Sequence, residues 1–207
     1  MTYDDRRRLP YVEAVVLEAM RLAPVVPLAL PHFTDTDVRV SNSSATTGER
    51  GELTIPAGSI VIANLWSVGR DPDVWNADSD IFRPERFLRK RSTAQRHISP
   101  VSGRHKAPEE DRSDAASAGT AVDDDGTSGG GSLVVDRGLA ESFYPFSFGA
   151  RRCVGESLGR LQIFIFFATI MRSCRLLQVE GSPPPGDGET YGDVIRPDAY
   201  EIRVVAR

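Results

Sequence analysis

The first strong hydrophobic pattern of the chain lies in residues 9–22. Apolar side chains recur there at the i, i+3, i+4, i+7 spacing of one helical face, at Val12, Val15, Val16 and Ala19. Pro10 falls in the first turn, where its missing N–H costs nothing. The other faces also carry apolar residues, namely Ala14, Leu17 and Met20. The pattern therefore predicts a helix that is buried on nearly all sides.

Shorter apolar runs follow, separated by turn residues. Three of them predict strands, at residues 38–40, 53–55 and 60–63, with a Pro-Ala-Gly turn before the last. A second helix is predicted for residues 155–174. Its most apolar part is nine residues long, too short to span a bilayer, and fits a buried core helix. Residues 200–204 alternate apolar and polar side chains, which predicts an edge or hairpin strand.

The composition changes abruptly between about residues 89 and 140, which are rich in Ser, Gly, Ala, Asp and Arg. This stretch holds too little apolar surface to offset the entropy lost on ordering, so it predicts a disordered surface insertion. The chain is accordingly divided into residues 1–88, the insertion 89–140, and residues 141–207. The first and last parts are expected to form one domain.

Composition and charge narrow the functional classes. The 207 residues are 40% hydrophobic and 26% charged, as in globular proteins, and the net charge of −4 gives no reason to expect nucleic acid as a partner. Two cysteines, Cys153 and Cys174, do not make a disulfide framework, which favours a reducing compartment. The polar run after Met1 has the pattern of neither a signal peptide nor a membrane anchor.

The main candidate functional residue is Cys153, which lies in a loop rich in Gly and Arg just before the second predicted helix. Each neighbour has a role if this sulfur binds a haem iron. Gly149 and Gly155 let the backbone turn tightly and approach a flat macrocycle. The helix N-terminus stabilises a negatively charged sulfur. Arg151 supplies a cation for a haem propionate, and Phe146 can shield the sulfur from water.

The spacing Phe-x-x-Gly-x-Arg-x-Cys-x-Gly at residues 146–155 closely resembles the haem-binding signature of the cytochromes P-450, the haem-thiolate monooxygenases. A lone cysteine is more often a buried, inert residue, but five signature positions match here in register. The resemblance implies haem b (iron protoporphyrin IX) as cofactor and Cys153 as the axial ligand of its iron. It also implies a mainly α fold with small β-sheets (α+β), corresponding to the C-terminal portion of the P-450 fold.

Two further motifs precede the cysteine loop in the order that the same family shows. These are Glu18-x-x-Arg21 and the Pro-Glu-Arg-Phe sequence that contains Arg86. From the residues alone, Glu18 and Arg21 form a solvated i, i+3 ion pair opposite the clearest apolar face of their helix. The resemblance instead implies a buried network of Glu18, Arg21 and Arg86, with a structural and not a catalytic role.

Other positions match the family more weakly. The resemblance implies a haem-propionate ligand in His32, for which a plain surface or core histidine is the alternative. The apolar residues before it resemble a substrate-contacting strand, at Val25, Val26, Leu28 and Leu30. Val194, in the turn of residues 192–194, resembles another substrate-contacting loop. Trp66 and Arg70 fit either a propionate-side contact or ordinary packing and surface positions.

The resemblance implies an oxidoreductase that inserts one atom of dioxygen into a small apolar organic substrate, such as a steroid, fatty acid or xenobiotic. Electrons would come from an NADPH-dependent flavoprotein reductase, docked on the basic face formed by Arg151, Arg152 and Arg160. Animal microsomal members of the family lie on the cytosolic face of the endoplasmic reticulum membrane, held by an N-terminal anchor.

Neither that anchor nor the oxygen-activating central helix of the family has a counterpart in this sequence. The chain alone is therefore expected not to work as a monooxygenase. Two alternatives stay open. One is a haem-thiolate isomerase or dehydratase, which needs no reductase. The other is a catalytically inactive, truncated haem-binding remnant.

Overall fold

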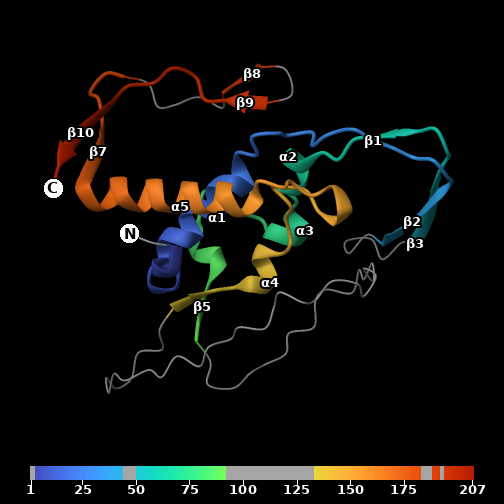
Figure 1. The fold of residues 1–207 in the computed structure, drawn as a ribbon, viewed down its shortest axis with the longest axis horizontal. Coiled ribbons are helices and arrows are strands. Elements are labelled where there is room, and N and C mark those ends of the chain that lie inside the picture. Colours follow the sequence, from blue (N-terminus) through green and yellow to red (C-terminus); the bar gives the residue numbers. More distant parts are fainter. Residues whose placement is uncertain (1–2, 44–49, 92–132, 183–187, 192–193) are drawn as a thin grey trace.

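Two helices form the centre of the molecule. The computed structural model describes residues 3–43, 50–91, 133–182, 188–191 and 194–207. Helix α1 (Pro10–Leu22) contacts helix α5 (Glu156–Ser173), the long helix that runs across Figure 1. Both predicted helices are confirmed, each within one residue of the predicted bounds. Short helical turns and two-stranded antiparallel ribbons surround them in the described part of the chain.

The buried face of α1 differs from the predicted one. Its most buried residues follow the spacing Ala14, Leu17, Glu18, Arg21, and none of them is more than 4% exposed. Ala19 is exposed, and most of the face that it shares with the valines is half-buried. The expectation of burial on nearly all sides was therefore wrong, and so was the solvated ion pair expected from the residues alone. Glu18 and Arg21 are buried, as the resemblance implied. Burial of this charged face is tolerated because the pair finds further partners, described below.

Every described strand pairs with one other strand, and all pairs are antiparallel. The ribbons are β1 (His32–Phe33) with β4 (Ile60–Val61), β2 (Val38–Ser43) with β3 (Arg50–Ile55), β5 (Leu88–Lys90) with β6 (Leu133–Val135), β7 (Cys174–Gln178) with β10 (Ile202–Ala206), and β8 (Glu189–Tyr191) with β9 (Val194–Arg196). The predicted strands at 38–40, 53–55 and 60–63 are confirmed, and the C-terminal strand lies two residues further on than predicted.

Six shorter helical turns connect these elements within the described residues: η1 (Tyr3–Arg8), α2 (Leu65–Val68), α3 (Pro72–Trp75), η2 (Pro84–Phe87), α4 (Arg137–Ala140) and η3 (Gly149–Arg151). Three of them begin at an Asn or Asp side chain that accepts a backbone N–H. Asn64 accepts from Ser67 at 3.0 Å, Asp71 from Asp73 at 3.0 Å, and Asp136 caps α4. These caps fix the starts of turns that are too short to be stable alone.

The boundaries of the predicted insertion need correction. Lys90 lies directly opposite Leu133 in the β5–β6 ribbon, so both edges of the stretch 89–140 belong to a strand pair. Helix α4 follows β6 along the chain, and Val135 and Leu139 of these two elements pack against the core. A disordered loop was therefore the wrong expectation for residues 133–140. Residues 92–132 lie outside the described part of the chain, and the expectation for them stays a prediction.

The core joins residues from both sides of that stretch. It consists of Ala14, Leu17, Trp75, Phe87 and Phe143. The three aromatic rings pack edge to face or tilted, with centroids 5.7 to 6.0 Å apart. The core thus holds α1, α3 and η2 against the start of the cysteine loop.

Helix α5 is buried on one side only. Phe164 and Ala168 are 2% and 3% exposed, whereas Ile163 and Phe166 are 40% and 71% exposed. The expectation of a buried core helix holds for one face only, because α1 and η1 cover only that face of α5. Among the described residues, no helix combines the length and the apolar character that a membrane span requires.

Candidate functional site

The cysteine loop folds back on itself ahead of α5. The backbone N–H of Cys153 donates to the carbonyl oxygen of Phe146 at 2.9 Å, and that of Arg152 donates to Gly149 at 3.1 Å. Gly149 has a φ of +75°, in the left-handed region that a glycine adopts without strain. The loop is therefore a closed turn that presents Cys153 at a fixed place beside the helix.

Cys153 is exposed and lies directly before the N-terminus of α5. Its carbonyl oxygen accepts the N–H of Glu156 at 3.2 Å, while no side chain caps the helix at Gly155. The first N–H groups of an 18-residue helix, and the positive end of its dipole, attract a negative charge at this end. The position suits a sulfur that carries negative charge when bound to a metal.

The surface around Cys153 has the chemistry that haem requires. Phe148, Val154 and Leu158, close to Cys153 in the sequence, are 69%, 103% and 58% exposed, so the loop and the first turn of α5 offer exposed apolar side chains. A Cβ added at Gly149 would meet nothing within 4 Å, which leaves room against the backbone. Arg151 is exposed nearby and can pair with a carboxylate. A soft sulfur ligand, an apolar surface and a cation together fit a haem with its propionates.

Phe146 is held in place by α5. Gly159 gives it room, because a Cβ there would come within 3.3 Å of the ring. The guanidinium of Arg160 lies 5.2 Å from the ring centroid and is itself paired with Glu156 at 2.8 Å. Of the three arginines expected on a basic face, Arg160 thus pairs with a carboxylate, and Arg151 and Arg152 are exposed. The sequence reading missed Gly159, whose spacing of six residues from the cysteine was the available signal.

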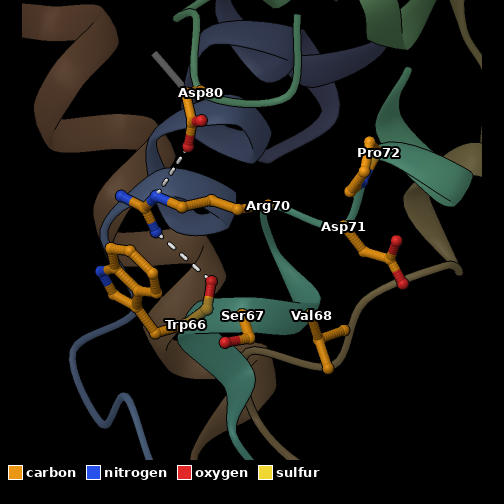
Figure 2. Close-up of a pocket in the computed structure, with 7 residues that line it drawn as sticks. All are labelled: Trp66, Ser67, Val68, Arg70, Asp71, Pro72 and Asp80. Carbon is orange, nitrogen blue, oxygen red and sulfur yellow. Dashed lines mark hydrogen bonds and ion pairs between the residues drawn. The ribbon is translucent and has the colours of Figure 1, made fainter. Parts of the chain in front are cut away.

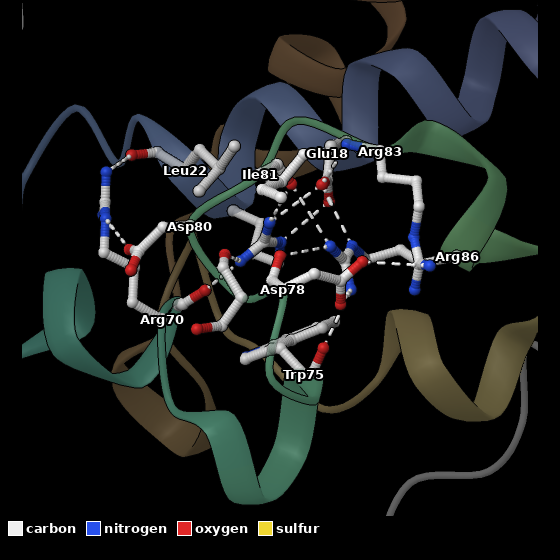
Figure 3. Close-up of polar contacts among 12 residues, drawn as sticks. Glu18, Leu22, Arg70, Trp75, Asp78, Asp80, Ile81, Arg83 and Arg86 are labelled. Atoms are coloured by element: carbon white, nitrogen blue, oxygen red, sulfur yellow. Dashed lines mark hydrogen bonds and ion pairs between the residues drawn. The ribbon is translucent and has the colours of Figure 1, made fainter.

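The structure brings Glu18, Arg21 and Arg86 into contact. Figure 3 labels Glu18 and Arg86 among the polar contacts of this region. The Nε and Nη2 of Arg21 donate to the two carboxylate oxygens of Glu18 at 2.7 and 2.8 Å. The Nε of Arg86 donates at 3.0 Å and the backbone N–H of Arg83 at 2.8 Å. The side chains of Glu18 and Arg21 are fully buried, and that of Arg86 is 3% exposed.

Burial alone would raise the pKa of the Glu18 carboxyl. The hydrogen bonds from Arg21, the Arg83 N–H and Arg86, with the charge of Arg21, outweigh burial and hold the pKa below its ordinary value. Glu18 is therefore ionised at neutral pH, and its charge is shared between two guanidinium groups.

Both guanidinium groups also bind backbone carbonyls of the segment between α2 and η2. Arg21 donates to Gly69 and, at 2.6 Å, to Ser79. Arg86 donates to Trp75 at 2.9 Å and to Asp78 at 3.0 Å. Because these acceptors are main-chain carbonyl groups, the sequence pattern does not predict them. The network therefore fastens α1 to the segment between α2 and η2, which contains α3 and is otherwise irregular.

Trp66 and Arg70 line a shallow surface hollow of about 500 Å³ (Figure 2). The Arg70 guanidinium stacks 3.9 Å from the Trp66 ring centroid, donates to the carbonyl of Leu22 at 2.7 Å and pairs with Asp80 at 3.4 Å. The residues that line the hollow include none from the cysteine loop. These contacts give Arg70 a packing role at the C-terminus of α1, where the negative end of the helix dipole stabilises a cation.

The remaining predicted site residues lie on β1, on β9 and in the segment between α1 and β1. His32 is exposed on β1, opposite Val61. Val25 meets the start of β9, because the N–H of Ile195, next to Val194, donates to the Val25 carbonyl at 2.9 Å. The two segments expected to contact substrate are thus adjacent. Val25 and Leu28 are exposed, and Val26 is half-buried.

These features define the class of the protein: a mainly α structure with small antiparallel ribbons (α+β) that presents a cysteine at the N-terminus of its longest described helix. The sequence model of the family described as "Cytochrome P450" matches residues 1–105 and 131–204. The chain therefore belongs to the cytochrome P450 family. The predicted fold class is confirmed, and haem b, the predicted cofactor, is the cofactor of this family.

Curated relatives span most of this chain. It is 30% identical over 203 residues to cytochrome P450 2U1 of Mus musculus, covering 98% of this chain and 28% of the relative. Cytochrome P450 1A1 of Oryctolagus cuniculus is 32% identical over 184 residues, covering 89% and 24%. The steroid 17-alpha-hydroxylase/17,20 lyase of Ictalurus punctatus is 29% identical over 199 residues, covering 96% and 29%. The chain thus spans less than a third of the length of these relatives.

Solved cytochrome P450 structures resemble this chain in fold. A zebra fish cytochrome P450 structure with abiraterone superposes with a TM-score of 0.65 at 25% identity, covering 100% of this chain and 36% of the other. A second zebra fish structure, with progesterone, gives a TM-score of 0.62 at 25% identity, covering 99% and 34%. The predicted resemblance to animal members of the family is confirmed.

Proposed function

We propose that this chain forms the iron-ligand portion of a haem-thiolate monooxygenase, with Cys153 as the axial ligand of haem b. The observation that carries the proposal is the exposed sulfur of Cys153, presented by a closed turn at the N-terminus of α5. A cysteine kept for packing would be buried. The exposed apolar side chains around it offer the surface that a macrocycle would cover.

Each residue of the loop has a task in this proposal. Cys153 binds the iron, and the helix N-terminus stabilises its charge. Phe146, held by α5, keeps water from the sulfur. Arg151 and His32 pair with the propionates. Gly149 and Gly155 allow the close approach. The bound haem supplies the redox chemistry by which one atom of dioxygen enters the substrate and the other is reduced to water.

The substrate of this proposal is a small apolar organic molecule, and it contacts exposed or partly exposed apolar side chains at Val25, Val26, Leu28 and Val194. Relatives support the class: one is named a steroid hydroxylase, and a similar structure holds progesterone. Fatty acids and xenobiotics belong to the same apolar class.

Electrons come from an NADPH-dependent flavoprotein reductase that docks at the exposed Arg151 and Arg152. We place the whole protein on the cytosolic face of the endoplasmic reticulum membrane. Reductase-dependent NADPH oxidation coupled to substrate hydroxylation separates this function from that of a haem-thiolate isomerase or dehydratase, which needs no reductase.

The test is optical. Carbon monoxide added to the reduced, haem-loaded full-length protein is expected to give the red-shifted absorption of a thiolate-bound haem. Cys153→Ser should abolish this absorption. Cys174→Ser, at the start of β7, is the matched control and should leave it unchanged. A Cys153→Ser variant with the wild-type spectrum would exclude the proposed ligand.

A second candidate is a haem-binding remnant without turnover. It is favoured by the exposed apolar face of α5, where Phe166 is 71% exposed in the described chain. An uncovered apolar face of this kind promotes association and leaves a haem open to water. Product formation by the purified 207-residue chain with a reductase would exclude the remnant.

A further inference from the structure

Two aromatic residues of the cysteine loop, Phe146 and Phe148, pack against different parts of the molecule. The ring of Phe146 lies against α5, where a Cβ on Gly159 would come within 3.3 Å of it and the Arg160 guanidinium is 5.2 Å from its centroid. The ring of Phe148 packs against Tyr144, with centroids 4.8 Å apart and planes tilted by 45°. In an extended chain, side chains two residues apart lie on the same side. The residue between the two rings must therefore redirect the backbone.

That residue is Ser147, and its backbone conformation is unusual. Its φ is +65°, in the left-handed region that residues with a side chain seldom adopt. Such a conformation costs free energy and persists only where the surrounding contacts impose it, which is most often the case at functional sites. The outlier therefore calls for a reason within the cysteine loop.

Hydrogen bonds on both sides of Ser147 impose the conformation. The N–H of Ser147 donates to the carbonyl of Tyr144 at 3.0 Å and closes a turn around Pro145. On the other side, the carbonyl of Phe146 accepts the N–H of Cys153 at 2.9 Å. Because both turns are closed, a change of φ at Ser147 must either break one of these bonds or move the ring of Phe146.

We propose that Ser147 is the positioning residue of the cysteine loop: its left-handed backbone keeps the Phe146 ring on α5, where the ring shields the sulfur. Ser147 acts only through Phe146. The inference rests on the proposed function, in which Cys153 is the haem ligand and Phe146 keeps water from it. Loss of the shield admits water, and a sulfur that gains a proton is a poorer ligand than a thiolate.

The measured quantity is a rate. The reduced carbon monoxide complex of the haem-loaded full-length protein is placed in dilute urea, and the loss of its red-shifted thiolate absorption is followed with time. Protonation of the sulfur ends this absorption, so the rate reports the access of water to Cys153. Circular dichroism recorded in parallel shows that the fold is intact while the absorption is lost.

Ser147→Val is expected to raise this rate about ten-fold, because a β-branched residue disfavours the left-handed backbone. Ser147→Gly, for which the same backbone is free of strain, should stay within about three-fold of wild type. Ser157→Val is the matched control. It makes the same substitution at an exposed position of α5, where the backbone is helical, and should also stay within about three-fold.

A double variant tests whether Ser147 acts through Phe146. Phe146→Ala removes the ring, so Ser147→Val should change the rate less than about three-fold in that background. A rise of similar size in both backgrounds would overturn the positioning role. So would a wild-type rate in Ser147→Val, or a rise in Ser147→Gly as large as that in Ser147→Val.

Should Ser147→Val bind no haem, Ser147→Thr decides, since it keeps the hydroxyl group and adds one methyl group to Cβ. A wild-type rate in Ser147→Thr would then overturn the proposal. The wild-type spectrum keeps the two proposals apart. A wild-type protein that never shows the thiolate absorption refutes the proposed function, whereas an absorption whose rate of loss is insensitive to the residue at position 147 refutes this inference alone.

Discussion

Replacing Glu18 by Gln tests the buried network most directly. The amide has nearly the shape of the carboxylate, so packing in the core is kept while the negative charge is lost. Glu18 accepts four hydrogen bonds, from two nitrogens of Arg21, one of Arg86 and the N–H of Arg83. In the variant, an NH₂ group faces at least one of these donors. The buried Arg21 loses the carboxylate with which it pairs, and Arg86 keeps its pair with the Asp78 carboxylate at 3.4 Å.

The expected cost is about 3–5 kcal/mol of unfolding free energy, as for other buried ion pairs that lose one partner. Full burial of Glu18 and Arg21 justifies the undiscounted value. The control is Glu156→Gln, which removes a carboxylate from an i, i+4 pair with Arg160 whose side chains are 26% and 29% exposed. That change should cost less than about 1 kcal/mol, because solvent screens the pair.

The assay is urea unfolding of the full-length protein followed by far-UV circular dichroism, with haem absorption recorded in parallel. Midpoint and slope give the free energy of unfolding. Glu18→Gln should unfold at markedly lower urea and lose haem earlier than Glu156→Gln. If the two variants unfold within about 1 kcal/mol of each other, the network does not hold the structure together and the reasoning fails.

The pH dependence has a definite sign. The pKa of Glu18 is lowered by folding, so the folded state favours the ionised form. Its contribution is complete above the ordinary pKa of 4.5 and is lost as the pH falls through the lower folded pKa. The difference in stability between wild type and Glu18→Gln should therefore be constant near neutral pH and shrink below about pH 4.5. A difference that grows on acidification would contradict this assignment.

Two further predictions concern close backbone approaches and the low-complexity stretch. A Cβ at Gly69 would overlap the carbonyl oxygen of Arg21, so Gly69→Ala should cost about 1–3 kcal/mol of stability, measured by thermal unfolding. The control Gly138→Ala should cost less than about 0.5 kcal/mol, because the nearest atom to its Cβ is 3.4 Å away. Equal losses in the two variants would refute the overlap. Replacing residues 91–132 with Asn-Gly should keep the melting temperature and the carbon monoxide spectrum, because the flanking residues are already paired in β5–β6. Removing residues 92–138 instead should destabilise the protein through loss of Val135 from the core, and a stable deletion of that length would show that β6 is dispensable.

The elements that were predicted well are those whose patterns are local. Helices α1 and α5 carry enough apolar residues at helical spacing to mark their ends within one residue. The strands β2 and β3 are short, but the Pro-Ala-Gly turn that follows β3 limits where it can end. By contrast, Leu133–Val135 has a strand composition only three residues long, and it becomes a strand because β5 supplies the ladder.

The sequence predicted the side-chain contacts of the charged network but not the backbone contacts around it. The cysteine loop and the three charged residues of the network are marked by residue type at fixed spacing. The hydrogen bonds that hold residues 25–30 are not marked in the sequence, because Trp66 and Ile195 donate through the main-chain N–H, which is the same for any side chain. For the same reason the buried face of α1 was misjudged. Its burial depends on carbonyl groups of Gly69 and Ser79, which no sequence pattern marks.

The balance between core and network explains why Glu18 should matter so much. Only eight apolar side chains are buried in the described part of the chain, and those of α5 lie on one face. In the segment between α2 and η2, Trp75 is the one buried hydrophobic side chain. Arg21 and Arg86 hold that segment through its carbonyls. Glu18 supplies the negative charge that both share, and the Asp78 carboxylate, 3.4 Å from Arg86, is a second partner for one of them. One carboxylate therefore keeps two cations, a helix and an irregular segment together, and its loss should release all of them at once.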